Sequence, residues 1–207
     1  MITLHHLDQS RSFRTLWLLE QIKQPYQLQR YYRDKTTHLA PESLKNIHPL
    51  GKSPVIEWEG KIIAESGAIV ELLIQKFAPD LAPDLNHPAY VDYLQWIHFS
   101  ESSAMVPYLL KLFNSIELKQ GTKLAFLENY SQVEFDKVFG FVNDYLQDKD
   151  FFVANRLTGA DFMMGYVLNG VVYNMQQAEN YPQIKRYVDG LTSLESWKAA
   201  VEIEAQR

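Results

Sequence analysis

The chain has 207 residues, of which 46% are hydrophobic and 22% are charged, and its formal net charge is -5 at pH 7. This length and composition allow a substantial buried core, in one domain or in two. The charged residues form no basic stripe of the kind that binds phosphate backbones, so we expect no nucleic-acid partner. The chain contains no cysteine, so a reaction that uses a thiol must take it from a small molecule.

The start of the chain lacks the cationic and apolar segments of a signal peptide. No apolar run approaches the roughly 18 residues that a membrane span needs. We therefore expect a soluble, cytoplasmic protein that has no membrane partner.

Residues 1–79 alternate between strand and helix patterns. The predicted elements are a strand at 2–7, a helix at 12–23, a strand at 26–31, strands at 55–58 and 61–64, and a helix at 66–77. The strand–helix–strand order of the first three predicts a right-handed crossover between two parallel strands. The turn residues Glu59 and Gly60 predict a hairpin between the later two strands.

Residues 80–87 form the expected linker, because prolines and turn-forming residues gather there. Beyond it, at 88–207, only helical patterns remain. Helices are predicted at 87–118, 122–146, 158–175, 182–191 and 194–205, and Pro107 predicts a kink in the first of them. The fold class is thus a βαβ-ββα domain of the α/β class followed by an all-α domain.

Four short segments resemble one known family when their order and spacing are taken together. They are SRSFR at 10–14, NIHPLGKSPV at 46–55, ESGAI at 65–69 and TGADF at 158–162. The chain resembles the cytosolic glutathione S-transferase superfamily over essentially its full length, and its first segment is similar to serine-containing bacterial and fungal-type members. This resemblance implies a thioredoxin-like glutathione-binding domain with a mixed four-stranded sheet, an all-helical bundle, and a homodimer that acts in detoxification.

Glu65 and Ser66 lie where the last predicted strand passes into a helix. The N–H groups and the dipole of a helix start favour an anion, such as the α-carboxylate of the γ-glutamyl group of glutathione. Ser66 can bind that carboxylate, and Glu65 can pair with the ammonium of the same group. Alternatively, Ser66 only caps the helix, and both roles can hold at once.

The resemblance implies that the Ser53–Pro54 peptide bond is cis and that the Ser53 backbone binds the cysteinyl part of glutathione like an added strand. The family usually has an aliphatic residue in place of Ser53. Lys52 suits the glycyl carboxylate of glutathione, and the alternative is a solvated loop lysine.

Ser10 is the preferred catalytic residue, because it lies four residues before Arg14, from which the family spacing counts. Its hydroxyl would donate to the glutathione sulfur and lower the pKa of the thiol, which is about 8.5 when free. Ser12 is the alternative; if Ser10 is catalytic, Ser12 is the better helix cap. Arg11 adds positive potential near the thiolate or is simply exposed.

The helix predicted at 87–118 carries the residues that the resemblance implies for the pocket of the electrophilic substrate. These residues are Glu101, Met105 and Tyr108, and Glu101 could also reach the amino group of glutathione. Helical spacing puts Ser102, Met105 and Tyr108 on adjacent turns, although such a stripe is more often core. Thr158 and Asp161 form a capping box, to which we assign a structural role only.

We predict no metal site, because His5 and His6 point to opposite faces of a strand and the other histidines lack ligand spacing. The predicted reaction is conjugation of glutathione, as a co-substrate, to an electrophilic small molecule. The alternatives are a glutathione-dependent peroxidase or disulfide reductase, or a non-catalytic glutathione-binding or regulatory protein.

Overall fold

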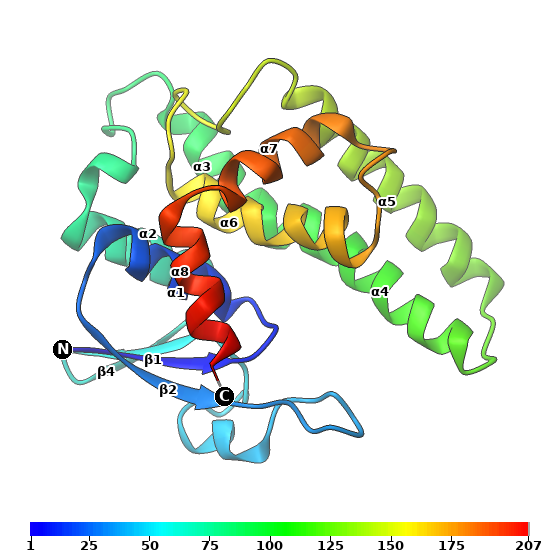
Figure 1. Ribbon diagram of the computed structural model, residues 1–207, viewed down its shortest axis with the longest axis horizontal. Helices are drawn as coiled ribbons and strands as arrows, with labels where there is room; N and C mark the ends of the chain where they lie inside the picture. Colours follow the sequence, from blue (N-terminus) through cyan, green and yellow to red (C-terminus); the bar gives the residue numbers. More distant parts are fainter. Residues whose placement is uncertain (207) are drawn as a thin grey trace. The chain divides into compact units, whose positions relative to one another are not determined.

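The computed structural model describes residues 1–206, and its contacts divide the chain into two compact units (Figure 1). The first unit comprises residues 1–82 together with 192–207, and the second comprises residues 83–191. The contacts thus group the last segment with the first unit, whereas the division expected from the sequence has one boundary, at 80–87.

A mixed four-stranded sheet forms the centre of the first unit, as predicted. Its strand order is β2-β1-β3-β4. The strands are β1 (Ile2–Leu7), β2 (Tyr26–Tyr31), β3 (Val55–Trp58) and β4 (Lys61–Ala64). β1 pairs with β2 in parallel and with β3 in antiparallel orientation, and β3 and β4 form the antiparallel hairpin. β1 is therefore a central strand, with β2 along its whole length and β3 along Thr3 to His5.

Three α-helices complete the first unit. They are α1 (Ser12–Ile22), α2 (Ser66–Phe77) and α8 (Glu195–Ala205), with short 3-10 turns at η1 (Glu42–Asn46) and η2 (Pro79–Leu81). α1 contacts β1, α2 and α8, so every residue of its first two turns is buried. Trp197 of α8 packs edge-on against Phe13 and Trp17, at ring distances of 4.9 and 4.7 Å. These aromatic contacts fix α8 to α1.

The second unit is helical. Its elements are α3 (Tyr90–Phe99), η3 (Ser100–Ala104), α4 (Met105–Lys119), α5 (Ala125–Tyr145), α6 (Gly159–Asn169), η4 (Gly170–Asn174) and α7 (Pro182–Thr192). The helix expected at 87–118 corresponds to α3, η3 and α4, in which the π-helical segment η3 interrupts the α-helical hydrogen bonding. Pro107 lacks an N–H for the carbonyl of Ser103, and this carbonyl lies in η3. The helix expected at 158–175 likewise ends in the π-helical segment η4.

The capping box at the start of α6 is present as predicted. The Asp161 carboxylate is fully buried and accepts hydrogen bonds from the Phe152 N–H at 2.9 Å, the Thr158 N–H at 2.8 Å and the Tyr187 hydroxyl at 2.9 Å. Burial raises the pKa of Asp161 to about 6, although these donors favour the charged form. The carboxylate therefore ties α6 to α7 and to the preceding loop.

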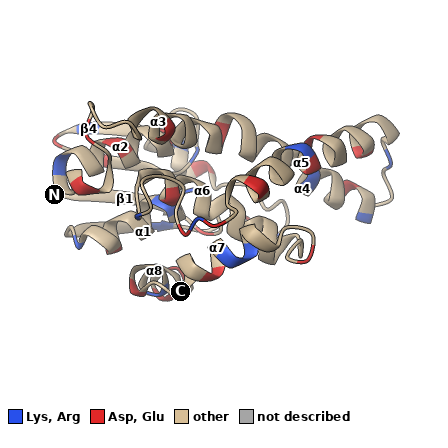
Figure 2. Cartoon of the chain, turned by 90° about the horizontal axis from the view of Figure 1, so that it is seen from above, with Lys and Arg blue, Asp and Glu red and all other residues tan. Residues whose placement is uncertain are grey.

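Basic and acidic residues are interspersed along the helices of both units (Figure 2). No helix within residues 1–206 is both long enough and apolar enough to cross a membrane.

Candidate functional site

Ser10 and Ser12 meet at the end of β1, where the chain turns into α1. Their hydroxyl oxygens lie 2.8 Å apart, and Ser10 Oγ also accepts a 3.2 Å hydrogen bond from the Ser12 N–H. Ser12 is fully buried, and its Oγ accepts a hydrogen bond from the Leu7 N–H at 3.2 Å. The expected capping role of Ser12 is wrong, because its hydroxyl faces β1 and α1 has no side-chain cap. Arg11 occupies the N-cap position and is half-buried.

His6 lies behind Ser12, a contact that the sequence pattern does not predict. His6 Nδ1 is 2.8 Å from Ser12 Oγ, and His6 Nε2 is 3.3 Å from Glu204 Oε1 on α8. Strand alternation separates His6 from His5, but it does not indicate that a helix so far along the chain packs against this face.

The Ser53–Pro54 peptide bond is cis, as the resemblance implies. The Ser53 hydroxyl donates to the His5 carbonyl at 2.8 Å and accepts from the Leu7 N–H at 3.2 Å. Pairing between β1 and β3 stops at His5 and Val55. Beyond this point, the Ser53 side chain links the cis-proline loop to the backbone of β1. Within residues 1–206, the backbone N–H and carbonyl of Ser53 make no hydrogen bond. Lys52, beside it, is exposed.

Glu65 and Ser66 form the junction between β4 and α2. Glu65 has φ of 70° and ψ of 114°, a strained conformation for a residue other than glycine. The Ser66 hydroxyl does not cap α2 but accepts a 3.1 Å hydrogen bond from Nη1 of the buried Arg14. The N–H groups of the first turn of α2 therefore have no side-chain cap, and they can bind an anion.

The residues expected in the electrophile pocket all lie in the second unit. Glu101 is half-buried in η3, while Met105 and Tyr108 are buried at the start of α4. Tyr108 packs directly on η4: a Cβ atom added to Gly170 would lie 2.5 Å from the Tyr108 hydroxyl. Burial raises the pKa of Tyr108. A role of Glu101, Met105 and Tyr108 in binding a second substrate stays a prediction.

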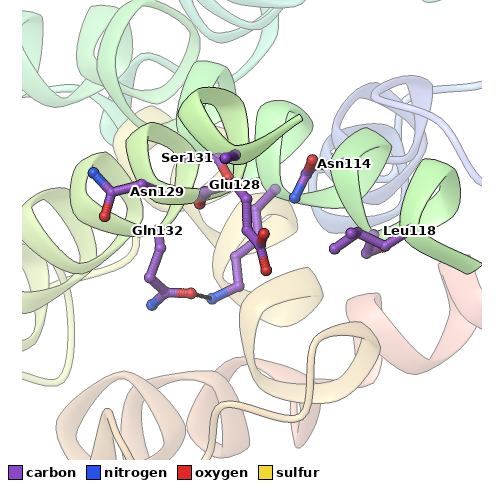
Figure 3. Close-up of a pocket in the computed structure, with 9 residues that line it drawn as sticks. Asn114, Leu118, Glu128, Asn129, Ser131 and Gln132 are labelled. Carbon is purple, nitrogen blue, oxygen red and sulfur yellow. Dashed lines mark hydrogen bonds between the residues drawn. The ribbon is translucent and has the colours of Figure 1, made fainter. Parts of the chain in front are cut away.

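A pocket of about 460 Å³ lies between α4 and α5 (Figure 3). The Lys111 ammonium donates to Gln132 Oε1 across it at 2.7 Å. The nine lining residues are Lys111, Asn114, Ser115, Leu118, Ala125, Glu128, Asn129, Ser131 and Gln132. None of them belongs to the predicted glutathione or electrophile sites.

The fold and the placement of these residues define a class of two-part proteins: a thioredoxin-like N-terminal part with a cis-proline loop, followed by a helical part. Residues 1–75 match the model of the glutathione S-transferase N-terminal domain, and residues 112–202 match that of the glutathione S-transferase C-terminal domain.

Known proteins extend the likeness over the whole chain. The chain is 30% identical to glutathione S-transferase 3 of Schizosaccharomyces pombe, over 98% of this chain and 87% of the relative. A crystal structure of a glutathione S-transferase from Actinobacillus pleuropneumoniae is 32% identical, with a TM-score of 0.87 over 99% of this chain and 93% of that one. Elongation factor 1-gamma-B of Xenopus laevis is 30% identical over 62% of this chain and 28% of its own length. The chain belongs to the glutathione S-transferase family.

Proposed function

We propose that the protein is a glutathione transferase that conjugates the glutathione thiolate to an electrophilic small molecule. One observation carries the proposal: the Leu7 N–H lies 3.2 Å from both Ser12 Oγ and Ser53 Oγ. The serine pair and the cis-proline loop therefore meet at the end of β1. A peptide that pairs with the Ser53 backbone would bring its cysteinyl sulfur to the Ser10 side of this junction.

The remaining contacts to glutathione follow from charge and exposure. The start of α2, with Ser66, receives the γ-glutamyl carboxylate, and Glu65 pairs with the ammonium of the same group. Lys52 is exposed beside the cis-proline loop and pairs with the glycyl carboxylate. The Arg14 guanidinium donates to the Ser66 hydroxyl, so this hydroxyl is free to donate its own proton to the ligand.

Ser10 is the residue that we assign to the sulfur. Its hydroxyl would donate to the thiolate and lower the pKa of the thiol, and the thiolate would then form a C–S bond with the electrophile. Burial supports Ser10 over Ser12, because Ser12 has no exposed surface whereas Ser10 is 6% exposed. Arg11 adds positive charge beside this position. Residues Glu101, Met105 and Tyr108 are proposed to contact the second substrate.

The cytoplasmic location and the role in detoxification belong to the same proposal. A non-catalytic role is the second candidate, because one relative carries the name of an elongation factor subunit rather than of a transferase. A glutathione-dependent peroxidase or disulfide reductase would use the same thiolate, so turnover of a peroxide separates that reaction from conjugation.

Ser10→Ala tests the proposal. Loss of a hydrogen bond to a charged sulfur weakens the interaction by about 1.5–3 kcal/mol, so we expect kcat/KM with a generic aryl halide to fall roughly 10- to 100-fold. Calorimetry should give a glutathione Kd close to that of the wild type. Ser12→Ala is the matched comparison, and a larger loss of turnover there would move the assignment to Ser12. Binding without any turnover by the wild type would favour the non-catalytic role.

A further inference from the structure

A continuous line of side chains leads from the Ser10 hydroxyl into the interior of the first unit. Ser10 Oγ lies 2.8 Å from Ser12 Oγ, which in turn lies 2.8 Å from His6 Nδ1. Beyond the imidazole ring, His6 Nε2 lies 3.3 Å from Glu204 Oε1, and the Gln9 N–H holds that oxygen with a 3.2 Å hydrogen bond. We call this line the serine–histidine relay; its members are Ser10, Ser12, His6 and Glu204.

Each member of the relay can accept a proton from its neighbour or pass one on. A neutral imidazole has one N–H and one acceptor nitrogen. His6 Nε2 lies at ion-pair distance from the Glu204 carboxylate but makes no hydrogen bond. A proton on Nε2 leaves Nδ1 as an acceptor for the Ser12 hydroxyl, whose other acceptor is the Leu7 carbonyl at 3.1 Å. Hydroxyl groups donate and accept, so Ser12 and Ser10 can transmit a proton without a change of position.

We propose that His6 receives the thiol proton of bound glutathione through Ser10 and Ser12, and that Glu204 stabilises the resulting imidazolium. The inference rests on the proposed function, because it concerns the thiol bound at Ser10. His6 and Glu204 act through other residues, and they are therefore positioning residues.

The transfer balances without any further reactant. The S–H bond breaks as its proton passes to Ser10 Oγ, the original Ser10 proton passes to Ser12 Oγ, and the original Ser12 proton passes to His6 Nδ1. The products are a thiolate that accepts a hydrogen bond from Ser10 and an imidazolium that lies between Ser12 and Glu204. A thiolate–imidazolium pair of this kind forms at lower pH than an isolated thiolate.

Among the charged groups around His6, Glu204 is the one that can stabilise an imidazolium at this position. His6 is buried, and a buried imidazolium needs an opposite charge. Each element that packs around it carries charge, and the side chains nearest in register or contact are Glu204 on α8, Arg30 on β2, Arg14 on α1 and Glu57 on β3. Arg14 is directed to Ser66, and Glu57 binds His5 on the opposite face of the sheet. Arg30, the register partner of His6, donates to the Ile203 carbonyl on α8 at 2.6 Å.

Glu204→Gln is the central test, because glutamine keeps an acceptor for the Gln9 N–H and removes the charge. The ultraviolet absorbance of the thiolate, followed against pH at saturating glutathione, reports the pKa of the bound thiol. We expect a pKa well below the free value of about 8.5 in the wild type and one higher by about one pH unit in Glu204→Gln. At pH 6.5, turnover of an aryl halide should then fall about tenfold, and it should recover as the pH rises.

His6→Asn is the second variant, because its amide can still bond to Ser12 but cannot take up a proton. We expect a larger increase in the pKa of the bound thiol than in Glu204→Gln. Circular dichroism checks the fold, and if His6→Asn does not fold, Glu204→Gln decides alone. Glu202→Gln is the matched control, since it makes the same charge change at an exposed position of α8 and should leave the thiol unchanged.

Calorimetry separates failure of the relay from failure of the proposed function. A wild-type protein that does not bind glutathione overturns the proposed function, and the relay with it. If the wild type and both variants bind glutathione and share one pKa of the bound thiol, the relay is overturned and the transferase proposal stands.

Discussion

At the scale of single residues, the Ser53 side chain makes hydrogen bonds that the aliphatic residue usual in the family does not make. Its hydroxyl joins the cis-proline loop to two backbone groups of β1, the His5 carbonyl and the Leu7 N–H. The side chain thus faces inward, while the Ser53 backbone N–H and carbonyl make no hydrogen bond within residues 1–206. A polar residue is compatible with this position because its hydroxyl forms hydrogen bonds with backbone groups of β1.

Ser53→Ala should therefore lower stability while glutathione binding persists. The His5 carbonyl loses a side-chain donor, whereas the Leu7 N–H keeps its bond to Ser12, so we expect a cost of about 1–2 kcal/mol. Urea denaturation measures the free energy of unfolding, and calorimetry measures the glutathione Kd. Ser43→Ala, at an exposed position in η1, is the control and should change neither. A Ser53→Ala protein as stable as the control would refute this account.

Motifs and local spacing were sufficient to select the candidate serines, but they were not sufficient to predict the hydrogen bonds of these serines. Ser10, Ser12, Ser53 and Ser66 could be selected from motifs and local spacing. The contacts of His6 with Glu204 and of Arg14 with Ser66 join segments far apart in the chain, and only the packing of α8 and α2 creates them. The caps considered at Ser12 and Ser66 were wrong because Leu7 and His6 bind the first hydroxyl and Arg14 binds the second, whereas the capping box of α6 is present.

At the scale of elements, the two π-helical segments distinguish the second unit from the continuous helices that periodicity predicts. The hydrophobic pattern at 87–118 and at 158–175 continues through these segments, so it gives no sign of a change in backbone hydrogen bonding. Tyr108 of α4 packs on η4 so closely that Gly170 has no room for a side chain. Glycine is therefore needed at position 170 because the Tyr108 ring occupies the space of a side chain, and not because the backbone turns there.

Gly170→Ala and Gly140→Ala form a matched pair that tests this contact. An added Cβ at Gly170 would lie 2.5 Å from the hydroxyl oxygen of Tyr108 and 2.8 Å from Cζ of its buried ring, so we expect a loss of about 1–3 kcal/mol in the free energy of unfolding. At Gly140, within α5, nothing lies within 4 Å of the added Cβ, and alanine should add up to about 1 kcal/mol through helix propensity. Thermal or urea unfolding of both variants measures the difference, and equal effects would contradict it.

At the scale of the whole molecule, the second unit exposes two apolar stripes at helical spacing. Val106, Phe113 and Ile116 lie along α4, and Phe126, Tyr130, Val133 and Phe141 lie along α5; all are more than 40% exposed. A large exposed apolar surface is typical of an interface with another protein. The family resemblance implies a homodimer, and the stripes support that proposal.

We expect sedimentation at micromolar concentration to give a mass of about twice the 24.1 kDa of one chain. Phe126→Asp combined with Val133→Asp places charges on the stripe of α5 and should shift the mass toward that of one chain. Asn129→Asp adds a charge at an exposed polar position of the same helix and serves as the control. A monomeric wild type would exclude the dimer, and a dimeric double variant would place the interface elsewhere.

Because α8 follows the second unit in the chain but packs on α1, translation completes the first unit only after the second. The ribosome completes the whole second unit before it synthesises residues 192–207, so the first unit waits for its last helix throughout that time. Until Trp197 arrives, Phe13 and Trp17 lack their aromatic partner. A chain whose translation stops before Glu204 also lacks the carboxylate beside His6. The contact between His6 and Glu204 can therefore form only in chains that have been translated through Glu204.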